Sequence, residues 1–358
     1  HAAGIYFHLN SARFRGLGEG LCMLGTMLFG AAIWLVAQIY HIDEHFPNGI
    51  LLWGVGALLM AFAMQSTPQA ILAAVLLAIW SGIESVGFNI NVVGAPLMIL
   101  LTLWPMAWLK KSRTLLAVVI PAFLISLLIP LLSYYNHPWF VIALFVNISG
   151  TLVGLSILVR YIGGFPKSSV IFGSMGWAIF VVLLYLATFP GICKELFCHH
   201  ESMTGSHGLR LAFVLAPLIL CGVIWAEVFH RHAFPRGKVD DAEGLEIYLV
   251  PLTVILAYGS MFSLSSFKAG WLIATMAFNL VFLALAFSMM VRGCRHGLLK
   301  PTVFGSIMLV AMMIARYFDL FDNLVVRGIV FVIVGAGIFF EGIVYSRARK
   351  QKTTVGIQ

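Results

Sequence analysis

Charged residues are scarce in this chain. Asp, Glu, Lys and Arg make up only 10% of its 358 residues, whereas 61% are hydrophobic. Soluble domains carry about 25% charged residues, so a surface this poor in charge would not stay dissolved in water. Lipid is the solvent that fits this composition, and helices satisfy their own backbone hydrogen bonds there. The composition therefore predicts an all-α, polytopic integral membrane helical bundle and excludes a soluble globular protein.

The sequence motifs of common catalytic sites are also missing. There is no GxxxxGK[ST] phosphate loop, no GxGxxG at a strand–helix turn and no GxSxG nucleophile elbow. No segment between the apolar runs is long enough for a separate soluble domain, so residues 1–358 are interpreted as one polytopic domain. We expect no cofactor, and the absence of a complete catalytic motif favours a non-enzyme over an enzyme.

Acidic residues are fewer than basic ones, 14 against 22, which gives a net charge of +8. In a soluble protein this excess would suggest nucleic-acid binding. Here the basic residues are spread over many connections between apolar segments, as the positive-inside rule predicts, and no connection combines a basic run with stacking aromatics. We therefore exclude nucleic acid as a partner and expect membrane lipids instead.

Long apolar runs are abundant. With about 20 residues per span as the yardstick, twelve candidate spans can be placed. They are Leu21–Tyr40, Ile50–Met64, Ala70–Gly87, Val92–Leu109, Leu115–Leu132, Phe140–Val159, Val170–Ala187, Leu211–Phe229, Ile247–Leu264, Trp271–Val291, Val303–Phe318 and Leu324–Tyr345. The chain begins with His1 rather than Met and is apolar at once, which indicates that an N-terminal part is missing.

The basic residues fall on alternate sides of these spans. Seventeen of the 22 lie before the first span or after an even-numbered one, and only Lys194, Arg210 and Lys268 lie in the opposite connections. The seventeen are Arg13, Arg15, Lys110, Lys111, Arg113, Arg160, Lys167, Arg231, Arg236, Lys238, Arg292, Arg295, Lys300, Arg347, Arg349, Lys350 and Lys352. The positive-inside rule therefore predicts that both ends of the chain are cytoplasmic.

Two arginines depart from this rule. Arg316 and Arg327 lie within apolar segments on either side of the last outer hairpin, with Asp319 and Asp322 between them. Arg316 and Asp319 are three residues apart and share one face of a helix. A charge within lipid is costly and usually marks a function or a partner. We favour a self-neutralising staple of the hairpin; the alternative is a site for an anionic small molecule or lipid headgroup.

Three acidic residues stand alone in apolar spans, namely Glu84, Glu227 and Glu341. Each is a candidate proton-relay carboxylate, because burial disfavours the charged form of a carboxyl group. Each can equally be an anchor that reaches the surface or pairs with a neighbouring base. Glu227 precedes Arg231 by one helical turn, which favours pairing at that position.

Histidine and cysteine give weaker candidates. His41 and His45 are spaced to ligate one metal if the segment is helical, but it runs toward Pro47 and lacks the Glu of a zincin motif. A polar interfacial loop is the simpler interpretation. Cys193 and Cys198 share one polar loop on the predicted outer side, where they either form a disulfide or stay free.

Both ends of the chain carry a recognisable pattern. Its parts are Gly18-Glu19-Gly20, Gly30-Ala31-Ala32, Gln38-Ile39-Tyr40-His41-Ile42, Leu52-Trp53, Trp80-Ser81-Gly82-Ile83-Glu84, Ala315-Arg316-Tyr317-Phe318-Asp319 and Val326-Arg327-Gly328. In these parts the chain resembles a large bacterial family of predicted membrane proteins, catalogued as domain of unknown function 2157. The resemblance implies a bacterial inner-membrane location, and it implies no activity that can be assigned to a residue.

Three functions fit these features. The first is transport of a small solute or a lipid or envelope precursor, with Arg316 and Arg327 holding an anionic group and Glu84 as a candidate coupling carboxylate. The second is a non-transporting scaffold or sensor. The third is a membrane-embedded enzyme that acts on a lipid-linked substrate, with a metal in the His-rich outer loops. Polar residues from several spans that converge on a midplane cavity favour transport, whereas a tightly packed bundle without such a cavity favours a scaffold. The number of spans and the intramembrane polar residues favour the first.

Overall fold

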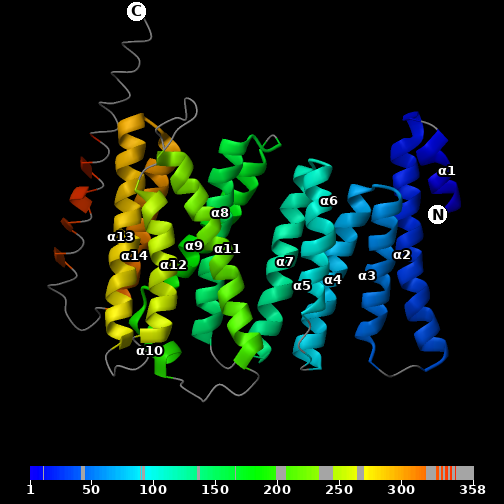
Figure 1. The fold of residues 1–358 in the computed structure, drawn as a ribbon, viewed down its shortest axis with the longest axis horizontal. Helices are drawn as coiled ribbons and strands as arrows, with labels where there is room; N and C mark the ends of the chain where they lie inside the picture. Colours follow the sequence, from blue (N-terminus) through cyan, green and yellow to red (C-terminus); the bar gives the residue numbers. More distant parts are fainter. Residues whose placement is uncertain are drawn as a thin grey trace, which may run out of the picture. The chain divides into compact units, whose positions relative to one another are not determined.

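All regular elements in the described part of the chain are helices (Figure 1). The computed structural model describes residues 1–10, 12–41, 45–88, 90, 93–134, 138–165, 167–198, 207–233, 245–263 and 270–319, with short pieces between 328 and 343. The side chains of some residues at helix ends, including 195–198, 207–214 and 317–319, lie outside this description. The predicted all-α fold is confirmed.

The chain divides into two compact units. Unit 1 comprises His1–Val141 and Gly163–Ile171, and unit 2 comprises Ile142–Ile162 and Phe172–Gln358. Of the two candidate sites described below, the first lies wholly within unit 1 and the second wholly within unit 2. The prediction of a single polytopic domain stays a prediction.

Seven of the described helices are long and apolar enough to cross a membrane. They are Arg15–Ile39, Thr67–Gly87, Arg113–Leu132, Phe140–Ile162, Ser168–Leu186, Gly270–His296 and Leu299–Arg316, and Pro47–Ala63, Gly94–Leu109 and Ile247–Ser260 are shorter apolar helices. The eighth predicted span lies within the helix His207–Ala233, and most of the twelfth lies outside the described residues. The protein therefore has several helices that are long and apolar enough to cross a membrane, but the predicted count of about twelve spans is not confirmed.

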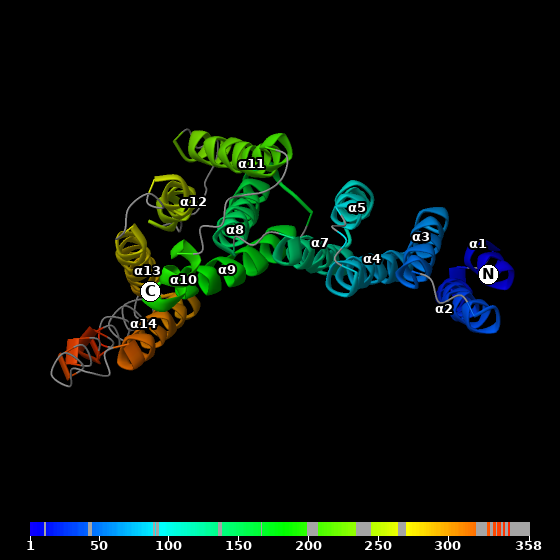
Figure 2. The ribbon, with the colours of Figure 1, turned by 90° about the horizontal axis from the view of Figure 1, so that it is seen from below.

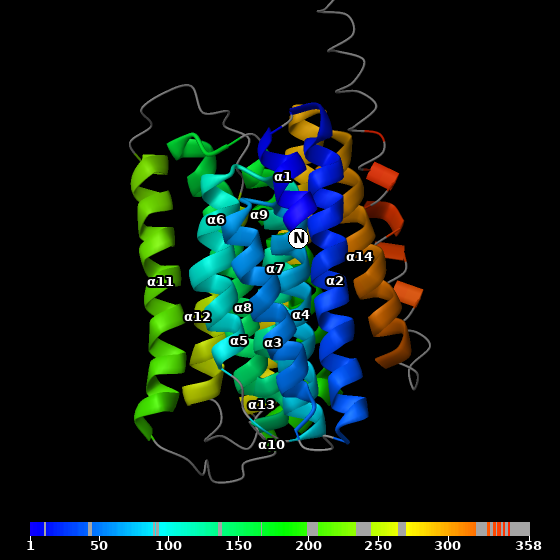
Figure 3. The ribbon, with the colours of Figure 1, turned by 90° about the vertical axis from the view of Figure 1, so that its right-hand side faces the viewer.

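In unit 1 the helices pack in the order of the chain. Helix α1 (Ala2–Asn10) lies along α2 (Arg15–Ile39), as Figure 3 shows, and α2 packs on α3 (Pro47–Ala63). Helix α3 packs on α4 (Thr67–Gly87), and α4 on α7 (Arg113–Tyr134) (Figure 2). The inward face of α4 carries the small residues Ala70, Ala73 and Ala74, which let neighbouring backbones approach closely. The opposite face exposes Val75 and Ile79, as expected of a surface toward lipid.

The fourth predicted span is not one regular helix. It consists of α5 (Gly94–Met98), a π-helical turn η2 (Ile99–Leu103) and α6 (Trp104–Leu109). The N–H of Trp104 bonds to the carbonyl of Ile99, five residues back. Pro105 follows directly; it has no N–H, and its ring would clash with a carbonyl in the preceding turn. The wider turn accommodates the proline, as single π-helical turns do within α-helices.

Unit 2 contains most of α8 (Pro138–Ile162) and α9 (Ser168–Leu186), together with α10 (Pro190–Cys198) and α11 (His207–Ala233). It also holds α12 (Glu246–Ser263), α13 (Gly270–His296) and α14 (Leu299–Asp319). Glycines on α8 mark its close contacts. A Cβ at Gly150 would lie 3.0 Å from Val254 of α12, and one at Gly154 would lie 2.9 Å from Ile224 of α11. Helix α8 therefore packs against both α11 and α12.

Three hairpins close through the same kind of turn. Gln65, Lys111 and Gly297 each follow a helix with a positive φ, of 49°, 51° and 62°. In each case the next residue donates its N–H to a carbonyl five residues earlier, over 3.1, 3.1 and 2.8 Å. This is the bonding of a Schellman cap, which ends a helix while satisfying its last carbonyls. The α3–α4, α6–α7 and α13–α14 connections are therefore tight.

Candidate functional site

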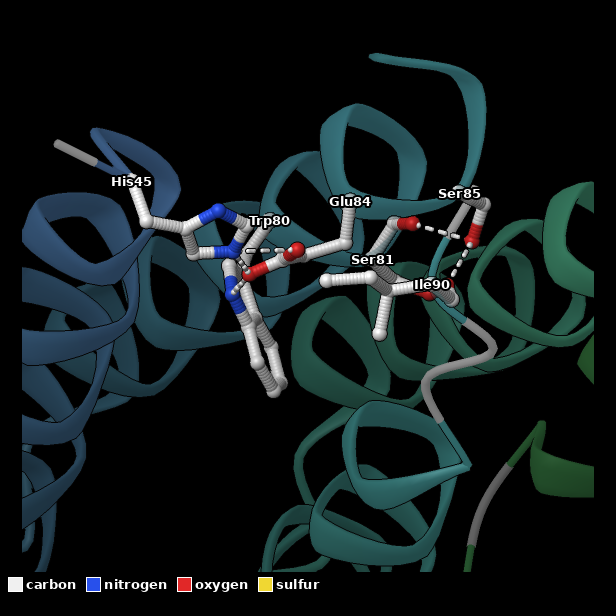
Figure 4. Close-up of polar contacts among 6 residues, drawn as sticks. All are labelled: His45, Trp80, Ser81, Glu84, Ser85 and Ile90. Carbon is white, nitrogen blue, oxygen red and sulfur yellow. Dashed lines mark hydrogen bonds and ion pairs between the residues drawn. The ribbon is translucent and has the colours of Figure 1, made fainter. Parts of the chain in front are cut away.

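A buried carboxylate near the end of α4 is the centre of the first candidate site. Trp80 and Glu84 lie four residues apart, on one face of the helix, and the Nε1–H of Trp80 donates to Oε1 of Glu84 over 3.0 Å. The next face is fixed by serines: Ser81 donates to the carbonyl of Ser126 in α7 over 3.0 Å, and Ser85 donates to the carbonyl of Ser81 over 2.8 Å. These bonds hold the end of α4 against α7 and fix the carboxylate (Figure 4).

His45 closes this site from the connection between α2 and α3. Its Nε2 lies 2.8 and 2.7 Å from the two carboxylate oxygens of Glu84 (Figure 4). The Glu84 side chain is only 4% exposed, whereas the His45 side chain is 30% exposed. At these distances the Nε2–H of His45 donates to the carboxylate, since an ionised carboxylate can only accept hydrogen bonds. A buried acid is thus linked to the surface through a group that can carry a proton.

Aromatic rings surround His45 at the same ends of the helices. The ring of Phe88, which caps α4, lies 4.3 Å from the His45 ring in an edge-to-face arrangement. Phe46, at the start of α3, lies 5.5 Å from Phe88, and Trp34 of α2 lies 6.3 Å from Phe46. These three rings are partly exposed, whereas Trp80 is buried behind the carboxylate. The site is therefore one carboxylate with an aromatic rim.

The candidate metal ligands His41 and His45 do not lie on one helix. Helix α2 ends at Ile39 and α3 begins at Pro47, so both histidines lie in the connection between these helices. His41 is exposed with a φ of 48°, and the Nε2 of His45 bonds to Glu84. Within the part of the chain that the structure describes, no three His, Cys, Asp or Glu residues are grouped to hold a metal. The arrangement instead supports the interpretation of a polar connection at a helix end.

Arg316 is the centre of a second cluster, in unit 2. Its Nη2 donates to the carbonyl of Thr188, just after α9 ends, and over 2.9 Å to Oδ1 of Asn279 in α13. Asn279 in turn donates to the same Thr188 carbonyl over 3.1 Å. The guanidinium therefore joins α14, α13 and the C-terminal end of α9, where a positive charge is favourable.

The hairpin partners predicted for Arg316 cannot be placed in the same way. The side chain of Asp319 lies outside the described side chains, and Asp322, Arg327 and Glu341 lie outside the described residues. The self-neutralising staple within the hairpin therefore stays a prediction. The structure adds two partners that the sequence did not indicate, a backbone carbonyl and Asn279, and these give Arg316 a structural role of its own.

Cys193 of α10 lies beside this cluster. Its buried thiol is free and donates to the carbonyl of Ala187 over 3.2 Å. Burial raises the pKa of the Cys193 thiol, while a hydrogen bond with Thr275 and the charge of Arg316 act in the opposite direction. The side chain of Cys198 lies outside the described side chains. The disulfide between the two stays a prediction, which the free Cys193 thiol does not support.

Glu227, the other described carboxylate candidate, has a simpler environment. Its Oε1 accepts a hydrogen bond from Nε of Arg231, one turn further along α11, over 2.6 Å. Both side chains are more than a third exposed. The spacing of Glu227 and Arg231 in the sequence predicted this pair. The contact makes Glu227 a surface anchor.

A third polar group was not anticipated from the sequence. In α8, Asn147 donates from Nδ2 to the hydroxyl of Tyr258 in α12 over 3.3 Å, and Thr151 donates to the Asn147 carbonyl over 2.9 Å. Trp225 of α11 donates to the carbonyl of Gly150 over 3.2 Å. All four side chains that donate or accept here are buried. The sequence shows these polar residues as isolated positions within apolar runs. It does not indicate that they form hydrogen bonds across three helices.

Comparison with known proteins bears on the N-terminal segment. A family model described as predicted membrane protein (DUF2157) matches residues 1–70. Residues 1–70 are therefore similar to this family, and we call them the DUF2157 segment. The DUF2157 segment includes α1, α2, His45 and α3, whereas Glu84 lies beyond it. No curated protein and no solved structure matches the chain.

The role of Arg316 gives a stability prediction. Arg316→Ala removes the donor that joins three helices, and we expect the free energy of unfolding to fall by about 2 kcal/mol, as for lost hydrogen bonds to a charged group. Arg295→Ala, at an exposed position in α13, is the matched control and should change it by less than about 0.5 kcal/mol. Thermal and SDS-induced unfolding of purified protein measure both. Unchanged stability together with lost binding of an anionic lipid would instead favour the ligand site.

Proposed function

We propose that this membrane protein transports a small solute or a lipid or envelope precursor, and that the His45–Glu84 pair carries the proton that drives it. The observation that supports this most strongly is the contrast in exposure within the pair. A carboxylate that is almost fully buried is hydrogen-bonded to an imidazole that is 30% exposed. Ionisable residues within spanning helices are costly and typically belong to proton relays or substrate pathways.

The polar group in unit 2 also supports transport over a scaffold. Asn147, Thr151 and Tyr258 bring amide and hydroxyl groups from α8 and α12 into the interior of their unit. A bundle that only scaffolds partners needs no such groups, since apolar residues pack as well without the cost of burying polar atoms. Transport requires polar groups at depth, because a polar solute exchanges its water for them.

The proposed orientation follows from the charges. The uncharged turn at Gln65 precedes α4, and the basic connection after α6 precedes α7. Both helices start at the same end of unit 1. The positive-inside rule places this end in the cytoplasm of a bacterial inner membrane. His45 and Glu84, at the opposite ends of their helices, then face the outside. A reporter fused between Lys110 and Arg113 reads the side directly, and an outside location would contradict this proposal.

The test uses proteoliposomes that contain a pH-sensitive dye. Amines, sugars, carboxylates and phosphorylated solutes are added in turn, and proton movement is recorded. We expect one class to drive proton movement in the wild type, and Glu84→Gln to abolish it, because the amide still accepts from Trp80 but carries no transferable proton. Glu227→Gln, at the surface pair, is the control and should leave it unchanged.

Two results contradict the proposal. The first is proton movement that persists in Glu84→Gln. The second is its absence with every solute class in wild-type protein that melts cooperatively, which would favour the scaffold.

A further inference from the structure

The charge balance around Glu84 indicates the sign of the group that it binds. Among the described residues of the elements packed on α4, the one titratable side chain that reaches the carboxylate is His45. Helix α3 carries no charged residue, and the charged residues of α2 and α7, Arg15, Glu19 and Arg113, lie within the first two turns of those helices. The site therefore presents one negative charge that one positive group neutralises.

The walls of the site indicate what kind of cation fits. Phe88 lies edge-to-face with the His45 ring at 4.3 Å, and Phe46 and Trp34 continue the rim outward. Aromatic rings attract cations through their electron-rich faces, most strongly when the cation is an organic ammonium whose carbons also pack on the rings. A bare metal ion needs several oxygen, nitrogen or sulfur ligands, and the described residues gather no such group here.

We infer that the His45–Glu84 site binds an organic ammonium group in exchange for the proton that the pair shares. In this step the ammonium ion takes the place of the imidazolium against the Glu84 carboxylate. His45 becomes neutral, one proton leaves to solvent, and no covalent bond other than N–H changes. The inference rests on the proposed function and names its substrate class, because a carrier whose proton and substrate compete for one carboxylate exchanges the two across the membrane.

The exchange follows from the single charge. The buried carboxylate is stabilised by one positive partner, and a second one would leave an excess positive charge among apolar rings. Proton and ammonium binding therefore exclude one another, and by linkage each lowers the affinity for the other by the same factor. An anionic substrate is excluded at this site by the carboxylate itself.

The test measures binding and proton release together on the full chain in detergent. Choline is the probe, and 3,3-dimethyl-1-butanol is its neutral isostere. Choline should bind saturably, quench tryptophan fluorescence and release up to one proton. Its affinity should fall as the pH is lowered, by up to about tenfold per pH unit, as competition with one proton requires. The neutral isostere should neither bind nor release a proton.

Variants separate the carboxylate from the rim. Glu84→Gln should abolish choline binding. Phe88→Leu should weaken it about tenfold, the size expected for one cation–π contact, whereas Phe88→Trp should retain it. Thermal melting of each variant shows that it is folded. If Phe88→Leu does not fold, Phe88→Trp against Phe88→His gives the same comparison with rings of different electron density.

The outcomes distinguish this inference from the proposed function. If choline neither binds nor releases a proton, while another solute class drives proton movement that depends on Glu84, the substrate class is wrong and the transport proposal stands. If choline binds without releasing a proton, exchange is refuted. If choline binds and releases a proton but no solute, choline included, moves protons into liposomes, the site holds a cation and the transport proposal fails.

Discussion

Replacing Gly293 by alanine is expected to lower the free energy of unfolding by about 3 kcal/mol, a large effect for adding one methyl group. A Cβ at Gly293 of α13 would lie 2.6 Å from the backbone nitrogen of Thr302 and 2.9 Å from its Cα in α14. Backbone atoms cannot rotate away as a side chain can, so the two helices must separate. The nearby Gly305 is equally close, with a Cβ 2.7 Å from the carbonyl oxygen of Ala286. The α13–α14 pair thus depends on direct contact between backbones, as close helix pairs in membranes do.

The matched control for this variant is Gly222→Ala in α11. No heavy atom lies within 4 Å of a Cβ at this exposed position. There the alanine should be neutral or stabilise the helix by about 0.5–1 kcal/mol, because glycine loses more backbone freedom when it becomes helical. Thermal unfolding of the two variants beside wild type measures the difference. Equal stability of Gly293→Ala and Gly222→Ala would show that α13 and α14 are not packed as described.

Replacing His45 by alanine is expected to destabilise the protein by about 3 kcal/mol at neutral pH, the size seen when one partner of a buried pair is removed. The Glu84 carboxylate would remain buried with Trp80 as its described side-chain donor. The loss should shrink as the pH is lowered, because protonation removes the uncompensated charge. Unfolding curves at several pH values measure this dependence.

The double variant His45→Ala/Glu84→Gln tests the cause. The amide is neutral and still accepts from Trp80, so we expect it to recover most of the lost stability. His41→Ala, at an exposed position four residues earlier, is the control and should change stability by less than about 0.5 kcal/mol. If the single and double variants are equally unstable, His45 contributes through packing on Phe88 and not through charge.

The sequence was informative where spacing along one helix determines the contact. Trp80 and Glu84 are four residues apart, and so are Glu227 and Arg231; in both cases the helix alone brings them together. The sequence indicates His45 only as a candidate metal ligand. It does not indicate the contact with Glu84, because that contact depends on the path of the chain from α2 to α3, and no local sequence pattern encodes that path. The sequence identified Glu84 as a candidate but not the group that completes its site.

Arg316 shows the same limit from another direction. A charge in an apolar segment was visible in the sequence, and the residue three positions on was its natural partner there. The structure adds the carbonyl of Thr188 and the amide of Asn279, which are 128 and 37 residues away in the chain. A free carbonyl at a helix end has no sequence signature, since every residue has one. Span counting was limited because composition shows where apolar runs lie but not how long each helix is: the structure has Pro47–Ala63, Gly94–Leu109 and Ile247–Ser260 as shorter apolar helices.

The tight turn between α3 and α4 has a consequence for how the protein is made. Only Met64, Gln65 and Ser66 separate the two helices, and none of them is charged. The turn has no charged residue to anchor it at a membrane surface, so α3 and α4 are suited to enter the membrane together as a hairpin. His45 precedes α3 and is therefore synthesised before Glu84. We therefore expect Glu84 to enter the bilayer after its partner His45 has been made.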